Sequence, residues 1–223
     1  MYMKDLKLLI KFPTRSRPSK FFNILDKYYL LLKNLNVEFV ISCDTDDITM
    51  NNEEVINKLN SYPYLKYYFE NNKSKIEAIN NNLKDKNFDI LLLASDDMLP
   101  VQRGYDEVIR TKMTETFPDT DGVLWFNDDF QGSNLNTLCI LGKKYYDRFG
   151  YIYHPDYKSL YSDTEFTLVS QELNKVKYFD QILIKHIQYS IVKESPDELY
   201  KKNDSLEQED RMVFEKRRLN NFK

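Results

Sequence analysis

Residues 88–100, FDILLLASDDMLP, decide how this chain folds. An unbroken apolar run, 90–94, is followed by Ser95 and the carboxylate pair Asp96 and Asp97. A short apolar run closed by polar residues is typical of a strand buried on both faces, as in a parallel sheet. Such a strand delivers its last residues to the carboxyl edge of the sheet, where open α/β sheets bind ligands.

The adjacent carboxylates Asp96 and Asp97 repel each other and stay ionised more readily beside a positive charge. A divalent cation that also binds a phosphate would supply that charge, since such ions prefer oxygen ligands. The simpler interpretation is a solvated loop that turns before Pro100. The rest of the sequence has to decide between these two interpretations.

Three further units of strand, polar loop and helix precede this stretch. The pattern predicts strands over 6–12, 37–43 and 65–69, and helices over 19–35, 53–59 and 74–83. Strands that alternate with helices indicate βαβ units and a parallel sheet with right-handed crossovers. The expected fold class is therefore α/β, with a mostly parallel central sheet flanked by helices.

The loops that follow these strands carry the side chains that a nucleoside diphosphate and a metal would need. They contain Pro13, Thr14 and Arg17, then Asp44 and Asp46, then Asn72 and Lys75, then Ser95, Asp96 and Asp97. Parallel strands end at one edge, so we expect these groups around one crevice. Cations and helix N-termini there would hold phosphates, and carboxylates would hold a ribose or an ion. The chain has no GxGxxG and no GxxxxGK[ST] motif, so neither a dinucleotide fold nor a P-loop is indicated.

Composition excludes several classes of protein. The 223 residues carry a net charge of -3 and are 42% hydrophobic, which predicts one large globular domain and argues against nucleic acid or a membrane surface as a partner. No apolar run approaches the roughly 18 residues of a membrane span, and the charged N-terminus is unlike a signal peptide. Cys43 and Cys139 lie in apolar runs and are expected to be buried free thiols, which favours a cytoplasmic location.

The second half of the chain supplies candidate acceptor-binding residues. The strand predicted over 122–126 ends in a polar group that comprises Trp125, Asn127, Asp128 and Asp129. An indole beside hydrogen-bonding groups can stack on a sugar ring, although a single Trp is more often part of a core. From residue 195 the chain is highly charged, which predicts one or two surface helices. These helices could pack on the domain, form a homodimer or contact another partner.

In this order the motifs resemble those of glycosyltransferases of the GT-A fold, closest to the family-2-like enzymes. Residues 13–18, PTRSRP, resemble the first-strand loop that holds the nucleotide, and Asp44 and Asp46 match acidic residues that face the ribose and base. Residues 72–75, NKSK, resemble the segment just before the metal strand, and 92–97, LLASDD, lie over the DXD motif.

Later motifs extend the resemblance over roughly residues 5–190. Asp163 and Glu165 lie where these enzymes carry the carboxylate that activates the acceptor, and His186 lies where many place a late metal-ligating histidine. The resemblance implies a metal on Asp96, Asp97 and His186. It also implies a GT-A domain over 1–190, with a nucleotide-binding half, 1–100, an acceptor-binding half, 101–190, and a charged helical tail, 191–223.

Two departures bear on the metal. The first Asp of the DXD pattern is Ala94 here, and Gln188 stands where some relatives have a second histidine. Metal binding would therefore rest on Asp96, with Asp97 beside it, and on His186. An imidazole ligand suits Mn²⁺ better than Mg²⁺. A lone histidine after an apolar strand can equally be a core or surface residue.

Asp163 and Glu165 have a structural alternative, because both lie at a predicted helix start. There a carboxylate caps the helix or favours its positive end. The functional hypothesis is a general base for the acceptor hydroxyl. Residues two apart do not share a helix face, so at most one of them is expected to reach the acceptor. Asp163 is the first candidate and Glu165 the second.

The sequence thus predicts a metal-dependent glycosyltransferase that uses Mn²⁺ or Mg²⁺. It would move a sugar from a UDP- or GDP-sugar to the hydroxyl of a glycan or another acceptor, and the resemblance implies inversion at the anomeric centre. A sugar-1-phosphate nucleotidyltransferase is one alternative, but the 13–18 loop lacks the glycines that such enzymes use. A degenerate carbohydrate-binding or scaffold protein is the other alternative, and Ala94 is its best support.

Overall fold

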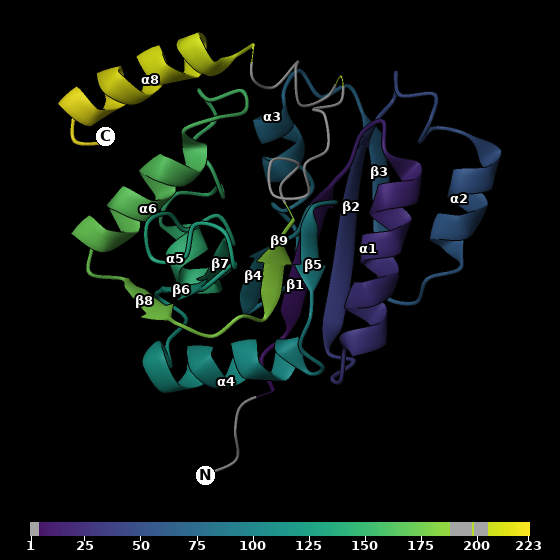
Figure 1. The fold of residues 1–223 in the computed structure, drawn as a ribbon, viewed down its shortest axis with the longest axis horizontal. Coiled ribbons are helices and arrows are strands. Elements are labelled where there is room, and N and C mark those ends of the chain that lie inside the picture. The colour runs from purple at the N-terminus through teal and green to yellow at the C-terminus, as the bar shows by residue number, and fades with distance from the viewer. Residues whose placement is uncertain (1–4, 188–197, 199–204) are drawn as a thin grey trace.

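The computed structural model describes residues 5–187, 198 and 205–223 as helices packed on both faces of a seven-stranded sheet (Figure 1). The strand order is β3-β2-β1-β4-β7-β6-β8, and every strand except β7 runs in the same direction. The strands are β1 Leu8–Pro13, β2 Val37–Asp44, β3 Leu65–Glu70, β4 Ile90–Leu93, β6 Val123–Phe126, β7 Ile140–Gly142 and β8 Val176–Phe179. The predicted α/β class with a mostly parallel sheet is confirmed.

The helices divide between the two faces of this sheet. They are α1 Pro18–Leu31, α2 Glu53–Asn60, α3 Lys75–Asn80, α4 Tyr105–Thr116, α5 Lys143–Asp147, α6 Ser162–Glu172 and α8 Glu207–Leu219. Apolar side chains of α1, α2 and α4 form one core cluster with the sheet. Those of α3, α5, α6 and α8 form a second cluster on the other face. The helices cover the two faces of the sheet, and the loops that follow the strands lie at its carboxyl edge.

Strand β4 lies at the centre of the sheet, as the sequence predicts for residues 90–94. It pairs with β1 in parallel, with Leu8 opposite Ile90, and all four of its residues are buried. Alternate side chains of a strand point to opposite faces. Accordingly, Ile90 and Leu92 belong to the first core cluster, while Leu91 and Leu93 belong to the second. Burial on both faces explains why the run is continuously apolar.

A small second sheet forms beyond the end of β4. Strand β5, Met98–Pro100, pairs in antiparallel fashion with β9, Ile184–His186 (Figure 1). The register sets Met98 opposite His186. Because Met98 directly follows the acidic pair, this pairing brings His186 to the edge where Asp97 lies.

Helix α8 is a surface helix that is packed onto the domain, which is one of the three arrangements considered for the charged tail. Asp210, Phe214 and Arg217 are buried on the inner side of α8, and Phe214 joins the second core cluster. Residues 188–197 and 199–204, which include part of the predicted tail and Gln188, lie outside the described part of the chain. The predicted boundary at residue 190 falls within the segment 188–197 and stays a prediction.

The cysteines lie on opposite faces of the sheet. Cys43 belongs to the first core cluster and Cys139 to the second, and both are buried free thiols, as predicted. Within the described ranges, no helix combines the length and apolar character needed to cross a membrane.

Candidate active site

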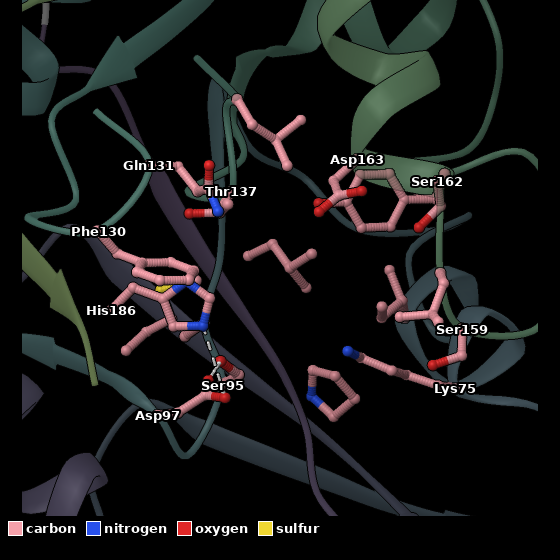
Figure 2. Close-up of a pocket in the computed structure, with 18 residues that line it drawn as sticks. Lys75, Ser95, Asp97, Phe130, Gln131, Thr137, Ser159, Ser162, Asp163 and His186 are labelled. Atoms are coloured by element: carbon pink, nitrogen blue, oxygen red, sulfur yellow. Dashed lines mark hydrogen bonds and ion pairs between the residues drawn. The ribbon is translucent and has the colours of Figure 1, made fainter. Parts of the chain in front are cut away.

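Two cavities meet at the carboxyl edge of the sheet. The smaller, of about 150 Å³, lies among the loops that follow β1, β2, β3 and β4. The larger, of about 390 Å³, lies between the loop after β4, the 130–137 loop and the start of α6 (Figure 2). Pro13, Lys75, Ser95 and Asp97 line both cavities. An extended ligand that fills both must therefore pass Lys75 and Asp97.

A network of charged side chains forms the wall of the smaller cavity. The Arg15 guanidinium donates to Asp44 Oδ2 and to Asp46 Oδ1, each at 2.6 Å. Asn72 Nδ2 donates to the other Asp44 oxygen at 2.7 Å. Asp44 and Asn72 line the cavity, whereas Asp46 does not. Arg15, which was not among the predicted site residues, binds both of these carboxylates at the end of β2.

Thr14 also faces the smaller cavity. Its side chain is buried and lines the cavity. Within the described residues, its Oγ1 has no hydrogen-bond partner. A buried hydroxyl without a partner is uncommon in folded proteins, so Thr14 can donate to a bound ligand.

Asp96 faces Arg17 in the smaller cavity. Arg17 Nη1 lies 3.1 Å from Asp96 Oδ1, and the side chains are only 9% and 10% exposed. Burial and the neighbouring charge of Asp97 raise the pKa of Asp96 to about 6, although Arg17 opposes this shift.

Asp97 instead faces His186. His186 Nε2 lies 3.7 Å from Asp97 Oδ2, and His186 Nδ1 lies 3.6 Å from Asp128 Oδ2 (Figure 2 draws the contact with Asp97). Burial alone would lower the pKa of His186, but Asp128 and Asp97 raise it to about 9. Burial would likewise raise the pKa of Asp97, but His186 and Ser95 hold it well below its usual range.

The Asp97–His186 pair fits a metal site with two protein ligands. Two atoms that each lie about 2.1 Å from one ion are roughly 3 to 4 Å apart, and the 3.7 Å separation falls within this range. Nowhere in the described ranges do three acidic, histidine or cysteine side chains group as metal ligands. Further ligands would have to come from a bound molecule or water. Asp96, the third predicted metal ligand, pairs with Arg17 and is not part of this Asp97–His186 pair.

Lys75 lies where the two cavities join. It begins α3, whose N-terminus is capped by Ser74 through the Glu77 backbone N–H at 3.1 Å. The Lys75 ammonium points into the larger cavity in Figure 2. Burial favours a higher pKa for both Asp96 and Asp97, and the charge of Lys75 opposes that effect at each of them. Lys75 therefore supplies positive charge at the junction.

Asp163 lines the larger cavity from the first turn of α6, on the wall across from His186 (Figure 2). One of its oxygens accepts a hydrogen bond from the Thr164 backbone N–H at 2.8 Å. Burial raises the pKa of Asp163. A carboxylate in this environment is a stronger base than a solvated one.

Glu165 lies away from the larger cavity. Its carboxylate accepts hydrogen bonds from Arg217 Nε at 2.7 Å and from the Tyr157 hydroxyl at 2.8 Å. The side chains of Glu165 and Arg217 are 7% and 9% exposed. Glu165 was predicted as the second candidate base, but it forms a buried ion pair between α6 and α8. The two carboxylates thus occupy different sides of α6, as their spacing requires.

The predicted acceptor-binding residues in β6 and in the loop after it do not line either cavity. Trp125 is buried, and its Nε1 donates to the Gly132 carbonyl at 3.0 Å. Asn127 donates to Asp180 at 2.7 Å. Trp125 therefore has the core role that was the alternative for a single Trp.

Asp128 and Asp129 organise the loop instead. Asp128 Oδ1 accepts the backbone N–H groups of residues 130, 131 and 132, and Asp129 pairs with Lys185 at 2.7 Å. The residues that do line the cavity, Phe130, Gln131 and Thr137, were missed. The Phe130 ring packs edge-on against His186, with centroids 5.4 Å apart.

The chain has the fold of GT-A-type glycosyltransferases. Comparison with solved structures agrees. A mannosyltransferase from Pyrobaculum calidifontis, solved with GDP-Man and Mn²⁺, matches 87% of this chain with a TM-score of 0.66 and 14% identity. S. aureus TarS 1-349 matches 81% with a TM-score of 0.63 and 15% identity, and its complex with UDP-GlcNAc matches equally well.

These similarities establish the fold. The matched regions cover 59% and 60% of those two chains, so this chain spans less than two thirds of their length. No known family profile and no curated protein matches the sequence.

Proposed function

We propose that this chain is a glycosyltransferase that moves a sugar from a nucleoside-diphosphate sugar to an acceptor hydroxyl. The observation that carries the proposal is the junction of the two cavities at Lys75 and Asp97. The nucleoside would bind in the smaller cavity beside Asp44 and Asn72. The diphosphate would lie at the junction, and the sugar and acceptor would share the larger cavity.

Asp97 and His186 are the residues that would hold a divalent cation, and diphosphate oxygens would supply further ligands. When bound, such a cation would neutralise the charge of the leaving diphosphate. An imidazole and a carboxylate together favour Mn²⁺ over Mg²⁺. Lys75 would add a second positive charge at the same place. In this proposal Asp96 does not bind the metal; it holds the Arg17 guanidinium at the wall of the smaller cavity.

Asp163 is the proposed general base. A carboxylate with a raised pKa removes a proton from a hydroxyl more effectively, and burial raises the pKa of Asp163. The acceptor hydroxyl would lose its proton to Asp163 as its oxygen attacks the anomeric carbon. A single displacement of this kind would invert the anomeric centre.

A binding protein with a degenerate site is the second candidate. Ala94 in place of the first DXD residue favours it, as does the lack of a three-residue metal cluster in the described part of the chain. Such a protein would bind a sugar or nucleotide without turnover.

A thermal-shift screen tests the proposal. UDP, GDP, CDP, dTDP and their sugars are each added with and without Mn²⁺, because a ligand of the native state raises stability by RT ln(1 + [L]/Kd). We expect one nucleotide to raise the melting temperature more in the presence of Mn²⁺. Asp97→Asn should remove the Mn²⁺ dependence.

Asp147→Asn is the matched control, since the Asp147 side chain is 54% exposed and lies outside both cavities. It should behave as wild type. Absence of any shift with all four nucleotides would overturn the proposal. A shift without turnover of any donor would favour the binding protein.

A further inference from the structure

The loop 158–160 forms a wall of both cavities and is fixed from the side of α8. Lys158 lines the smaller cavity, and Ser159 and Leu160 line the larger one. The fully buried Asp210 carboxylate accepts the backbone N–H groups of these three residues at 2.7 to 2.8 Å. Three hydrogen bonds to one charged group hold the loop in a defined position.

The opposite side of the loop is tied to α3. The Ile76 backbone N–H donates to the Lys158 carbonyl at 3.3 Å. Ser159 therefore lies next to the start of α3, where Lys75 faces the junction of the cavities. Figure 2 shows Ser159 and Lys75 on the same wall, across the cavity from His186.

The Ser159 hydroxyl has no hydrogen-bond partner within the described residues. Only 6% of Ser159 is exposed. Of the two cavities, Ser159 lines only the larger one. Leaving a buried hydroxyl unpaired costs stability, and most buried polar groups have partners. The Asp210 carboxylate fixes the backbone of Ser159 beside the cavity, and a ligand in the cavity could supply the partner that the hydroxyl lacks.

We propose that Ser159 hydrogen-bonds the sugar moiety of the donor and so helps to determine which sugar is accepted. The inference rests on the proposed function. Ser159 lines the larger cavity but not the smaller one, so it would contact the sugar and not the nucleoside. Ser159 lies beside Lys75, where the diphosphate is proposed to bind. The sugar that Ser159 would contact is therefore the one attached to the diphosphate.

Binding measurements on Ser159→Ala test this assignment. The probes are UDP-GlcNAc against UDP and GDP-mannose against GDP, each with Mn²⁺. We expect affinity for the bound sugar nucleotide to fall about three- to tenfold, the effect of losing one hydrogen bond. Affinity for the free nucleotide should be unchanged. The ligand-free variant should melt at the same or a higher temperature, because it loses an unpaired buried hydroxyl.

Ser170→Ala is the matched control. Ser170 is also buried, but its hydroxyl donates to the Thr167 carbonyl at 2.9 Å and lies outside both cavities. This variant should melt at a lower temperature and keep every affinity.

The outcomes separate the inference from the function on which it rests. If the wild type binds none of the four nucleotides of the thermal-shift screen and none of their sugars, both are overturned; where the screen identifies CDP or dTDP, that nucleotide and its sugar replace the probes above. If the wild type binds a sugar nucleotide and Ser159→Ala binds it equally well, only the inference fails. It fails also if the variant loses affinity for the free nucleotide to the same extent as for the sugar nucleotide.

Discussion

Asp163 is the residue whose chemistry can be tested most directly. Asp163→Asn keeps the size of the side chain and removes the base, so turnover should fall by roughly 10²- to 10⁴-fold. Donor affinity, measured by calorimetry, should remain close to that of the wild type. In the wild type, the acid limb of the rate profile should lie above the usual range for an Asp carboxyl, because burial raises the pKa of Asp163. Unchanged turnover in this variant would remove Asp163 from the mechanism.

Lys11 is a buried residue that the proposed reaction does not use. It is fully buried on β1, where its ammonium donates to the Asn81 carbonyl at 2.8 Å and to the Ser42 hydroxyl. Burial lowers the pKa of Lys11 to about 7, although the charge of Glu70 opposes the shift. The folded protein therefore releases this proton at a much lower pH than the unfolded chain does.

The pH dependence of stability should report Lys11. Between pH 7 and about 10 the unfolded chain holds the Lys11 proton and the folded state does not, so this residue makes stability rise with pH. Below pH 7 its destabilising effect is complete. Lys11→Met should lower the slope of unfolding free energy against pH over this window, as urea titrations would measure. An unchanged slope would mean that Lys11 keeps its proton in the fold.

At the scale of elements, the Glu165–Arg217 pair joins α6 to α8. Removing one member leaves a buried charge without its partner, so Glu165→Gln and Arg217→Met should each cost about 3 kcal/mol of unfolding free energy. The double variant should cost clearly less than the sum, because neither charge is then left alone. Urea denaturation of the four proteins measures this coupling.

An exposed ion pair provides the comparison for that cycle. Lys144 and Asp119 are 2.7 Å apart, but their side chains are 59% and 54% exposed. The same cycle there should give a small coupling energy, since solvent screens the charges. Equal coupling at both places would contradict the role given to burial.

For the whole molecule, metal and nucleotide are expected to bind cooperatively. The candidate metal site offers two protein ligands, Asp97 and His186, and the diphosphate would supply the others. Mn²⁺ alone and UDP or GDP alone should therefore give smaller thermal shifts than the two together, by more than the sum. Additive shifts would place the metal and the nucleotide at independent sites.

The sequence predicts most of the sheet, because its signals are local. The apolar run 90–94 and the three strands before it could be recognised from a few neighbouring residues, and parallel strand ends then gather the polar loops at one edge. The pairing of β5 with β9 gave no such signal, because it joins segments far apart in the chain. His186 and Asp97 were identified by resemblance, and only the fold shows that they face each other while Asp96 faces Arg17.

Residues whose roles depend on distant partners were predicted less well. Glu165 and Asp163 look alike in sequence. In the fold, Arg217 on α8 forms an ion pair with Glu165, which lies away from the larger cavity, while Asp163 lines it. Asp210 looks like one more charge on a solvated helix, but backbone N–H groups of the 158–160 loop surround it. Charge patterns indicate exposure only when such partners are absent.

The hydrogen bonds from the 158–160 loop to Asp210 also determine when the candidate site can form during protein synthesis. The sheet and both sets of cavity loops are translated before α8, yet the 158–160 wall is fixed by a carboxylate on α8. The site can therefore reach its final shape only after α8 has emerged from the ribosome. Nascent chains arrested before residue 210 should bind sugar nucleotides more weakly than released chains do, which a pull-down of stalled ribosomes would show.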